Sequence, residues 1–146
     1  MTEYIAEAPT FVDSEPTITG PAGIVSVARE WEASEQEHLI VILMDTRHHV
    51  LHSYELYRGT VNECSGKVGE VYREAIRRNA AALAVVHNHP GNSVEPSAQD
   101  TDFTRQLIKA ADLLGFTFLD HVIIAPNHTY KSLRASFSSL WEETYR

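Results

Sequence analysis

The segment AALAVVHNHPGNSVEPSAQD, residues 81–100, constrains the fold and chemistry of this chain more than any other stretch. It begins as a short run of small and β-branched apolar residues, which is typical of a strand buried on both faces. The run stops at two histidines that flank an asparagine, and a loop rich in proline, glycine and asparagine follows. The pattern predicts a buried strand whose end carries converging polar side chains.

Strand and helix patterns are mixed along the rest of the chain without strict alternation. The predicted strands are residues 37–45, 50–60, 81–87, 116–126 and 130–136. The predicted helices are residues 21–34, 68–80, 97–114 and 137–146, with Gly115 as a helix stop. These elements predict an α/β sandwich built around a mixed sheet, with helices flanking it.

Length and composition limit the class of protein. A chain of 146 residues suits one domain with a real core, which we place at residues 21–146. Residues 1–20 are acidic and rich in proline and threonine, so we expect a flexible arm there. The chain has no run of eighteen apolar residues and no signal-peptide pattern at its start, so we expect no membrane span and a cytoplasmic location. A single cysteine excludes a multi-cysteine zinc site.

The charge balance argues against a broad DNA-binding surface. The chain carries 12 basic and 20 acidic residues, for a net charge of −8. Neutralisation of phosphates dominates the affinity of most DNA-binding proteins, so we expect at most weak, salt-sensitive DNA contacts. The segment YREAIRR, residues 72–78, is the local candidate for such contacts.

The two histidines of the HNH segment are candidate metal ligands. Residues i and i+2 of a strand point to the same side, so His87 and His89 converge while Asn88 points away. Two converging imidazoles are a good start for a divalent metal site. The alternative is that one or both satisfy hydrogen bonds in the core. The letters do not indicate an HNH nuclease, because three adjacent residues of one strand cannot supply that hairpin-plus-helix unit.

Asp100 is the candidate third ligand. It lies in the first turn of the helix that opens at Ser97, and the tight loop before that helix can bring it beside His89. Two histidines and one carboxylate leave a fourth position for water, as in a catalytic zinc site. The alternative is a capping box between Ser97 and Asp100. Both interpretations can hold together.

Hydrolysis by a zinc-activated water also needs a proton acceptor. Glu37 is the preferred candidate, because it stands at the start of the apolar strand LIVILM. The alternative is that Glu37 is an ordinary solvated carboxylate at the end of a strand. Glu35, two residues earlier, is the rival for the role.

Taken together, Glu37, the pair His87 and His89, Ser97 and Asp100 resemble the JAMM motif of JAB/MPN-plus metallopeptidases. Longer stretches resemble the bacterial RadC-like branch of that family over roughly residues 21–133. Those stretches are EHLIVILMDTRHHVL, RGTVNE, REAIRRNAAALAVVHNHP, PSAQD, LDHVII and YKSL. The chain reads HNHPGN where the family usually has HNHPSG. The resemblance implies the cytidine-deaminase-like JAB/MPN fold.

The resemblance also implies an activity. It assigns His87, His89 and Asp100 as Zn²⁺ ligands, Glu37 as the general acid/base, and Ser97 as the residue that steadies the oxyanion. The implied reaction is hydrolysis of a peptide or isopeptide bond in an unknown peptide or protein substrate.

The alternative is a DNA-repair-associated role without peptidase activity, as the family name suggests. The acidic segment of residues 1–20 is too short to form the helix-hairpin-helix-like region that many RadC-like proteins carry. An intact ligand set argues against a catalytically silent scaffold.

Overall fold

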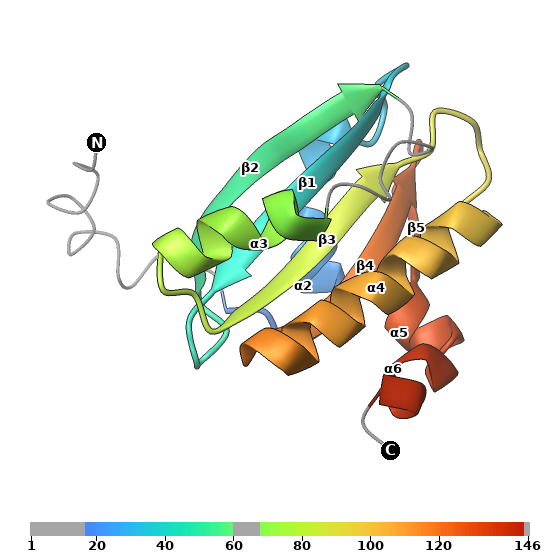
Figure 1. Ribbon diagram of the computed structural model, residues 1–146. Helices are drawn as coiled ribbons and strands as arrows, with labels where there is room; N and C mark the ends of the chain where they lie inside the picture. Colours follow the sequence, from blue (N-terminus) through green and yellow to red (C-terminus); the bar gives the residue numbers. More distant parts are fainter. Residues whose placement is uncertain (1–16, 60–67, 145–146) are drawn as a thin grey trace, which may run out of the picture.

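The computed structural model describes residues 17–59 and 68–144 (Figure 1). These residues form a five-stranded sheet with helices on both faces, so the predicted α/β class is confirmed. The strands are β1 (Glu37–Met44), β2 (Val50–Gly59), β3 (Ala82–Asn88), β4 (Thr117–Ala125) and β5 (Thr129–Ser132). The helices are α2 (Pro21–Val27), the 3-10 helix η2 (Arg29–Trp31), α3 (Val68–Arg77), α4 (Ala98–Leu114), α5 (Leu133–Ser136) and α6 (Ser139–Thr144).

The sheet is mixed, with the strand order β2-β1-β3-β4-β5. β3 and β4 are parallel, and the other neighbouring strands are antiparallel. Parallel neighbours need a crossover connection, and α4 provides it between β3 and β4. The crossover starts at the carboxyl end of β3, so the HNH segment and the first turn of α4 lie at one edge of the sheet.

Two hydrophobic cores lie on the two faces of the sheet. α3 and α4 cover one face, and α2 covers the other (Figure 1). Along β1, Leu39 and the odd-numbered residues after it pack under α3 and α4, whereas Ile40 and the even-numbered ones pack toward α2. Residues 39–44 are each at most 1% exposed. Burial on both faces explains why this strand is an unbroken apolar run in the sequence.

Helix α4 ends where the sequence predicts. Gly115 has φ 88° and ψ 23°, a left-handed conformation that favours glycine, and its backbone N–H donates to the Ala111 carbonyl. Of the helices in the described ranges, none is long and apolar enough to cross a membrane.

The first helix and the last strand differ most from their predicted bounds. The first helix ends at Val27 and is followed by the single 3-10 turn of η2, so it is shorter than the predicted 21–34. The last strand ends at Ser132, not at residue 136. The Ser132 hydroxyl accepts the Ala135 backbone N–H, and this N-terminal cap turns the chain into α5.

The last residues of the expected N-terminal arm lie on the folded domain. Thr17 forms a bridge with His49, and the Ile18 backbone N–H donates to the His48 carbonyl at 2.9 Å. The Ile18 side chain is buried in the core under α2. Residues 17–20 therefore lie against the domain, with the buried Ile18 side chain as their apolar contact. Residues 1–16, the segment 60–67 with Cys64, and residues 145–146 lie outside the described residues.

Candidate metal centre

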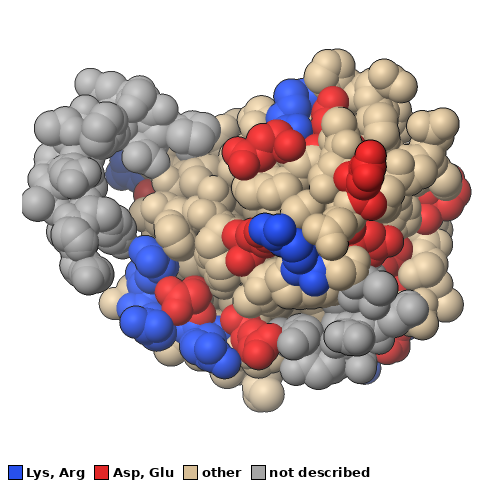
Figure 2. Space-filling view, turned by 90° about the horizontal axis from the view of Figure 1, so that it is seen from above, with Lys and Arg blue, Asp and Glu red and all other residues tan. Residues whose placement is uncertain are grey.

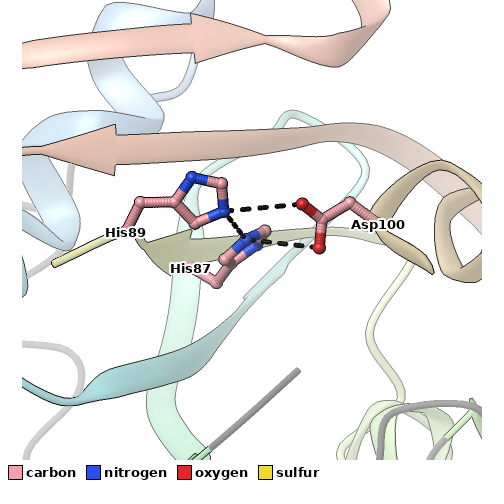
Figure 3. A group of neighbouring side chains, drawn as sticks. All are labelled: His87, His89 and Asp100. Atoms are coloured by element: carbon pink, nitrogen blue, oxygen red, sulfur yellow. Dashed lines mark hydrogen bonds and ion pairs between the residues drawn. The ribbon is translucent and has the colours of Figure 1, made fainter. Parts of the chain in front are cut away.

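The end of β3 directs two imidazoles toward the first turn of α4. His87 lies on the face of the sheet that α3 and α4 cover, and His89 follows the strand directly. The backbone N–H of His89 donates to the Ile124 carbonyl of β4 at 2.8 Å, which extends the strand conformation past Asn88. Figure 3 shows both rings pointing toward the carboxylate of Asp100.

The N-terminus of α4 holds that carboxylate in place. Ser97 is the N-cap: its hydroxyl oxygen accepts the Asp100 backbone N–H at 3.0 Å. In return, Asp100 Oδ2 accepts the Ser97 backbone N–H at 2.8 Å. This is the capping box that the sequence left open as an alternative. It does not compete with the metal-site interpretation, because the same box points the Asp100 carboxylate at the histidines.

One ligand atom from each of these three residues lies close enough to the others to share one ion. His87 Nε2 is 2.9 Å from His89 Nε2 and 3.5 Å from Asp100 Oδ1, and His89 Nε2 is 3.4 Å from Asp100 Oδ2 (Figure 3). Zn–N and Zn–O bonds of about 2.0–2.2 Å in a tetrahedral site separate neighbouring ligand atoms by roughly 3.3–3.6 Å. The three side chains can therefore hold a metal ion with small adjustments.

Two further observations fit a cation at this place. Asp100 is 1% exposed, and its Oδ1 atom accepts no hydrogen bond although water cannot reach it. A buried carboxylate oxygen without a partner is costly, and a cation would satisfy it. His89 Nδ1 lies 3.1 Å from the Ser93 carbonyl, which can only accept. His89 Nδ1 therefore carries a hydrogen, and the neutral ring offers the Nε2 lone pair to the site.

The electrostatics of the cluster are strongly coupled. Burial acts to raise the pKa of Asp100, but the imidazoles of His87 and His89 and the Ser97 backbone N–H outweigh it and hold this pKa far below its usual range. The Asp100 carboxylate in turn raises the pKa of His89, against the effect of burial. Asp100 is therefore ionised, and without a metal a proton on His89 can compensate its charge.

A third histidine, which the sequence analysis did not select, lies behind the first. His121 of β4 is fully buried, and its Nε2 is 2.7 Å from His87 Nδ1. Its Nδ1 is 2.6 Å from the hydroxyl of Thr104, which lies one turn after Asp100 in α4. Burial, and next the neighbouring His87, lower the pKa of His121 well below its ordinary value. The signal in the sequence was a histidine inside the apolar strand LDHVIIA.

Glu37 is near the cluster but outside it. The group of side chains that can share an ion consists of His87, His89 and Asp100 within the described ranges. Glu37 starts β1 on the same face of the sheet, and its charge contributes to the raised pKa of His89. Its Oε1 atom is buried and accepts no hydrogen bond. Glu35 is exposed, so the structure distinguishes the two carboxylates by burial.

The comparisons with known proteins show which family this chain belongs to. The family model for the RadC-like JAB domain matches residues 18–138. The chain belongs to the RadC-like JAB domain family. A UPF0758 protein of Chloroflexus aurantiacus is 44% identical over 118 residues, which cover 80% of this chain and 51% of the relative. A UPF0758 protein of Thermosynechococcus vestitus is 37% identical over 134 residues, which cover 92% of this chain and 51% of the relative. The chain thus spans about half the length of the curated relatives it matches.

One cavity of this RadC-like domain lies apart from the candidate metal centre. It has a volume of about 450 Å³ and lies on the α2 side of the sheet, with Ile18, Arg47, Leu119 and Arg134 among its lining residues. None of the five candidate site residues lines it. The three side chains that could hold a metal ion instead form a tight cluster at the carboxyl end of β3.

Proposed function

We propose that this RadC-like JAB domain is a zinc-dependent metallohydrolase that cleaves peptide or isopeptide bonds. The observation that carries the proposal is the convergence of His87 Nε2, His89 Nε2 and the Asp100 carboxylate at a buried point, with one carboxylate oxygen left without a hydrogen bond. Two imidazoles and one carboxylate suit zinc and leave a coordination position open for catalysis. When bound, zinc supplies a Lewis acid that polarises a carbonyl and makes water nucleophilic at neutral pH.

Glu37 is the proposed proton carrier. Its buried carboxylate oxygen without a partner lies on the face of the sheet that carries the histidines. In the proposed reaction the Glu37 carboxylate takes a proton from the attacking water and returns it to the nitrogen of the leaving amine. Glu35 precedes the strand and is exposed to solvent, so it is less suited to the role.

Ser97 is the proposed donor to the oxyanion. Its hydroxyl oxygen accepts the Asp100 N–H, so the hydroxyl hydrogen remains available for a substrate oxygen. A fixed donor of this kind acts on charge that develops during acyl transfer. The capping bond fixes the position of the hydroxyl before a substrate arrives.

The distribution of charge disfavours the DNA-associated alternative. Figure 2 shows Lys and Arg side chains next to Asp and Glu side chains over one face, without an unbroken basic stripe. On α3, Arg77 and Arg78 pair with Glu74 at 2.9 and 3.1 Å. These pairs reduce the positive charge that helix α3 offers to phosphates.

The test uses metal analysis followed by cleavage of a proteome-derived peptide library. The protein, purified without chelators, should contain about one zinc per chain by the ligand argument. Mass spectrometry should detect cleaved peptides with the zinc-loaded protein and none with the Asp100→Ala variant. Purified protein that neither contains zinc nor binds added zinc would refute the metal centre. Zinc-loaded protein that cleaves neither the peptide library nor isopeptide-linked conjugates would refute the hydrolase.

A further inference from the structure

A chain of hydrogen bonds connects the candidate ligand His87 to the backbone of the candidate ligand Asp100. His87 Nδ1 contacts His121 Nε2 at 2.7 Å, and His121 Nδ1 contacts Thr104 Oγ1 at 2.6 Å. Thr104 Oγ1 lies 2.7 Å from the Asp100 carbonyl oxygen. His121 and Thr104 are both fully buried, so water cannot replace any of these partners.

The Asp100 carbonyl oxygen, at the end of this series of hydrogen bonds, determines which atom donates in each bond. A carbonyl oxygen can only accept, so at 2.7 Å the Thr104 hydroxyl donates to Asp100. Because the only hydroxyl hydrogen of Thr104 is used in that bond, the Thr104 oxygen accepts a hydrogen bond from His121 Nδ1–H. The hydrogen-bond contacts of the buried His121 ring are His87 Nδ1 and the Thr104 hydroxyl, neither of which is a carboxylate, so with Nδ1–H donating to Thr104 the ring Nε2 accepts from His87 Nδ1. His87 then presents the Nε2 lone pair to the ligand cluster.

The opposite assignment of donors and acceptors in these hydrogen bonds is less favourable. If Thr104 donated to His121, the Thr104 and Asp100 oxygens would face each other at 2.7 Å without a hydrogen between them. One hydrogen bond would be lost in a place that water does not reach. His121 Nε2–H would then donate to His87, and the His87 hydrogen would sit on Nε2, where it blocks a metal. The geometry therefore favours the metal-competent arrangement before any ion binds.

We propose that His121 and Thr104 are positioning residues, which fix the tautomer of His87 so that its Nε2 lone pair faces the metal centre. The proposal deepens the proposed function and rests on its ligand assignment. Outer partners of metal-bound histidines are usually carboxylates, carbonyls or water, and they typically change metal affinity by roughly 10–100-fold. Here a neutral imidazole takes that place, and a threonine hydroxyl orients it.

Thr104→Val removes the hydroxyl and keeps the shape of the side chain. It should weaken zinc binding by about tenfold, the lower end of the effect of an outer partner. Thr104→Ser restores a hydroxyl and should recover most of the affinity. Thr101→Val is the matched control: Thr101 lies on the same helix, and its hydroxyl donates only to the Ala98 carbonyl at 2.9 Å. It should bind zinc as the unaltered protein does, measured by competition with a chromophoric chelator.

A second pair of variants tests His121 directly. His121→Gln keeps an acceptor that can reach His87 Nδ1, whereas His121→Leu leaves that N–H buried without a partner. The Gln variant should bind zinc at least about tenfold more tightly than the Leu variant. This comparison decides the proposal if Thr104→Val does not fold. Equal affinities of the two variants would overturn it.

The tautomer itself can be measured without metal. Long-range ¹H–¹⁵N correlations of the imidazole rings should show His87 with its hydrogen on Nδ1 in the metal-free protein, and a smaller share of this form in Thr104→Val. A hydrogen on Nε2, or a Thr104→Val variant with unchanged tautomer and unchanged zinc affinity, would overturn the proposal. Equal zinc losses in Thr104→Val and Thr101→Val would also overturn it. If the unaltered protein binds no zinc, the proposed function fails, while the tautomer measurement still decides this inference.

Discussion

The side-chain amide of Asn88 binds the backbone on both sides of Glu37. Its Oδ1 accepts the His38 N–H at 2.7 Å, and its Nδ2 donates to the Gln36 carbonyl at 2.8 Å. Asn88 stands between His87 and His89 in the sequence but points to the opposite face of the sheet. One short segment therefore supplies two ligand candidates and also holds the strand start that carries the proposed proton acceptor.

The Asn88→Ala variant tests this link. It leaves the buried His38 N–H without its acceptor, which should lower the free energy of unfolding by about 1–3 kcal/mol, and it also removes the donor to the Gln36 and Ser34 carbonyls. Hydrogen exchange at the His38 amide should become faster, while zinc binding persists because His87 and His89 are unchanged. Asn92→Ala, in an exposed loop, is the control and should change neither quantity. Unchanged exchange at His38 would contradict the role of Asn88.

Asp100→Asn tests the carboxylate ligand. The substitution keeps the size of the side chain and removes its charge, so zinc affinity should fall by more than the roughly 10–100-fold expected for an outer partner. Asp102→Asn, on the exposed side of the same helix, should leave affinity unchanged. Isothermal titration or chelator competition measures both. Similar affinities for the two variants would exclude Asp100 as a ligand.

Glu37→Gln separates proton transfer from metal binding. The amide keeps the volume but cannot accept the proton, so hydrolysis should fall by about 10²-fold or more, while zinc content and melting temperature remain. Glu35→Gln should change little, because Glu35 is exposed. If Glu35→Gln abolished hydrolysis and Glu37→Gln did not, the assignment of the two carboxylates would be reversed.

Substitutions of Ser97 distinguish capping from catalysis. Ser97→Ala should lower the free energy of unfolding by about 1 kcal/mol through loss of the cap, whereas Ser97→Gly should cost only a few tenths. Both remove the hydroxyl and should reduce hydrolysis by roughly 10²–10³-fold, the scale of a lost oxyanion donor. Zinc affinity should be largely spared, because the Ser97 backbone N–H to Asp100 remains. If the hydrolysis rates of the two variants instead fell in proportion to their loss of stability, the role of Ser97 would be capping alone.

Zinc affinity should depend on pH through His89. Asp100 raises the pKa of this imidazole, and a protonated imidazole cannot ligate. As the pH falls below that raised pKa, zinc must displace one proton, so affinity should decrease by about tenfold per pH unit. NMR titration of the metal-free protein should show a lower His89 pKa in Asp100→Asn and no change in Asp102→Asn. A pH-independent affinity across this range would contradict the coupling.

Much of the site could be predicted because its parts are local in the chain. The i, i+2 spacing of His87 and His89 places both rings on one side of a strand, whatever the strand packs against. The capping box joins Ser97 and Asp100 within a single helical turn. Apolar periodicity predicts the strands and α4, but it does not indicate the N-terminal cap at Ser132. The predicted last strand is therefore longer than the observed one, which ends at Ser132.

The sequence by itself determined the α/β class, the likeness to RadC-like JAB domains and the set of candidate ligands. Only the tertiary structure decided which other polar residues support them. Asn88 reaches β1 because β3 pairs with it, and His121 reaches His87 because β4 lies parallel to β3. That Glu37 is half-buried whereas Glu35 is exposed likewise depends on what covers the start of β1. Local periodicity reflects one element at a time, whereas these contacts depend on the register between strands distant in the sequence.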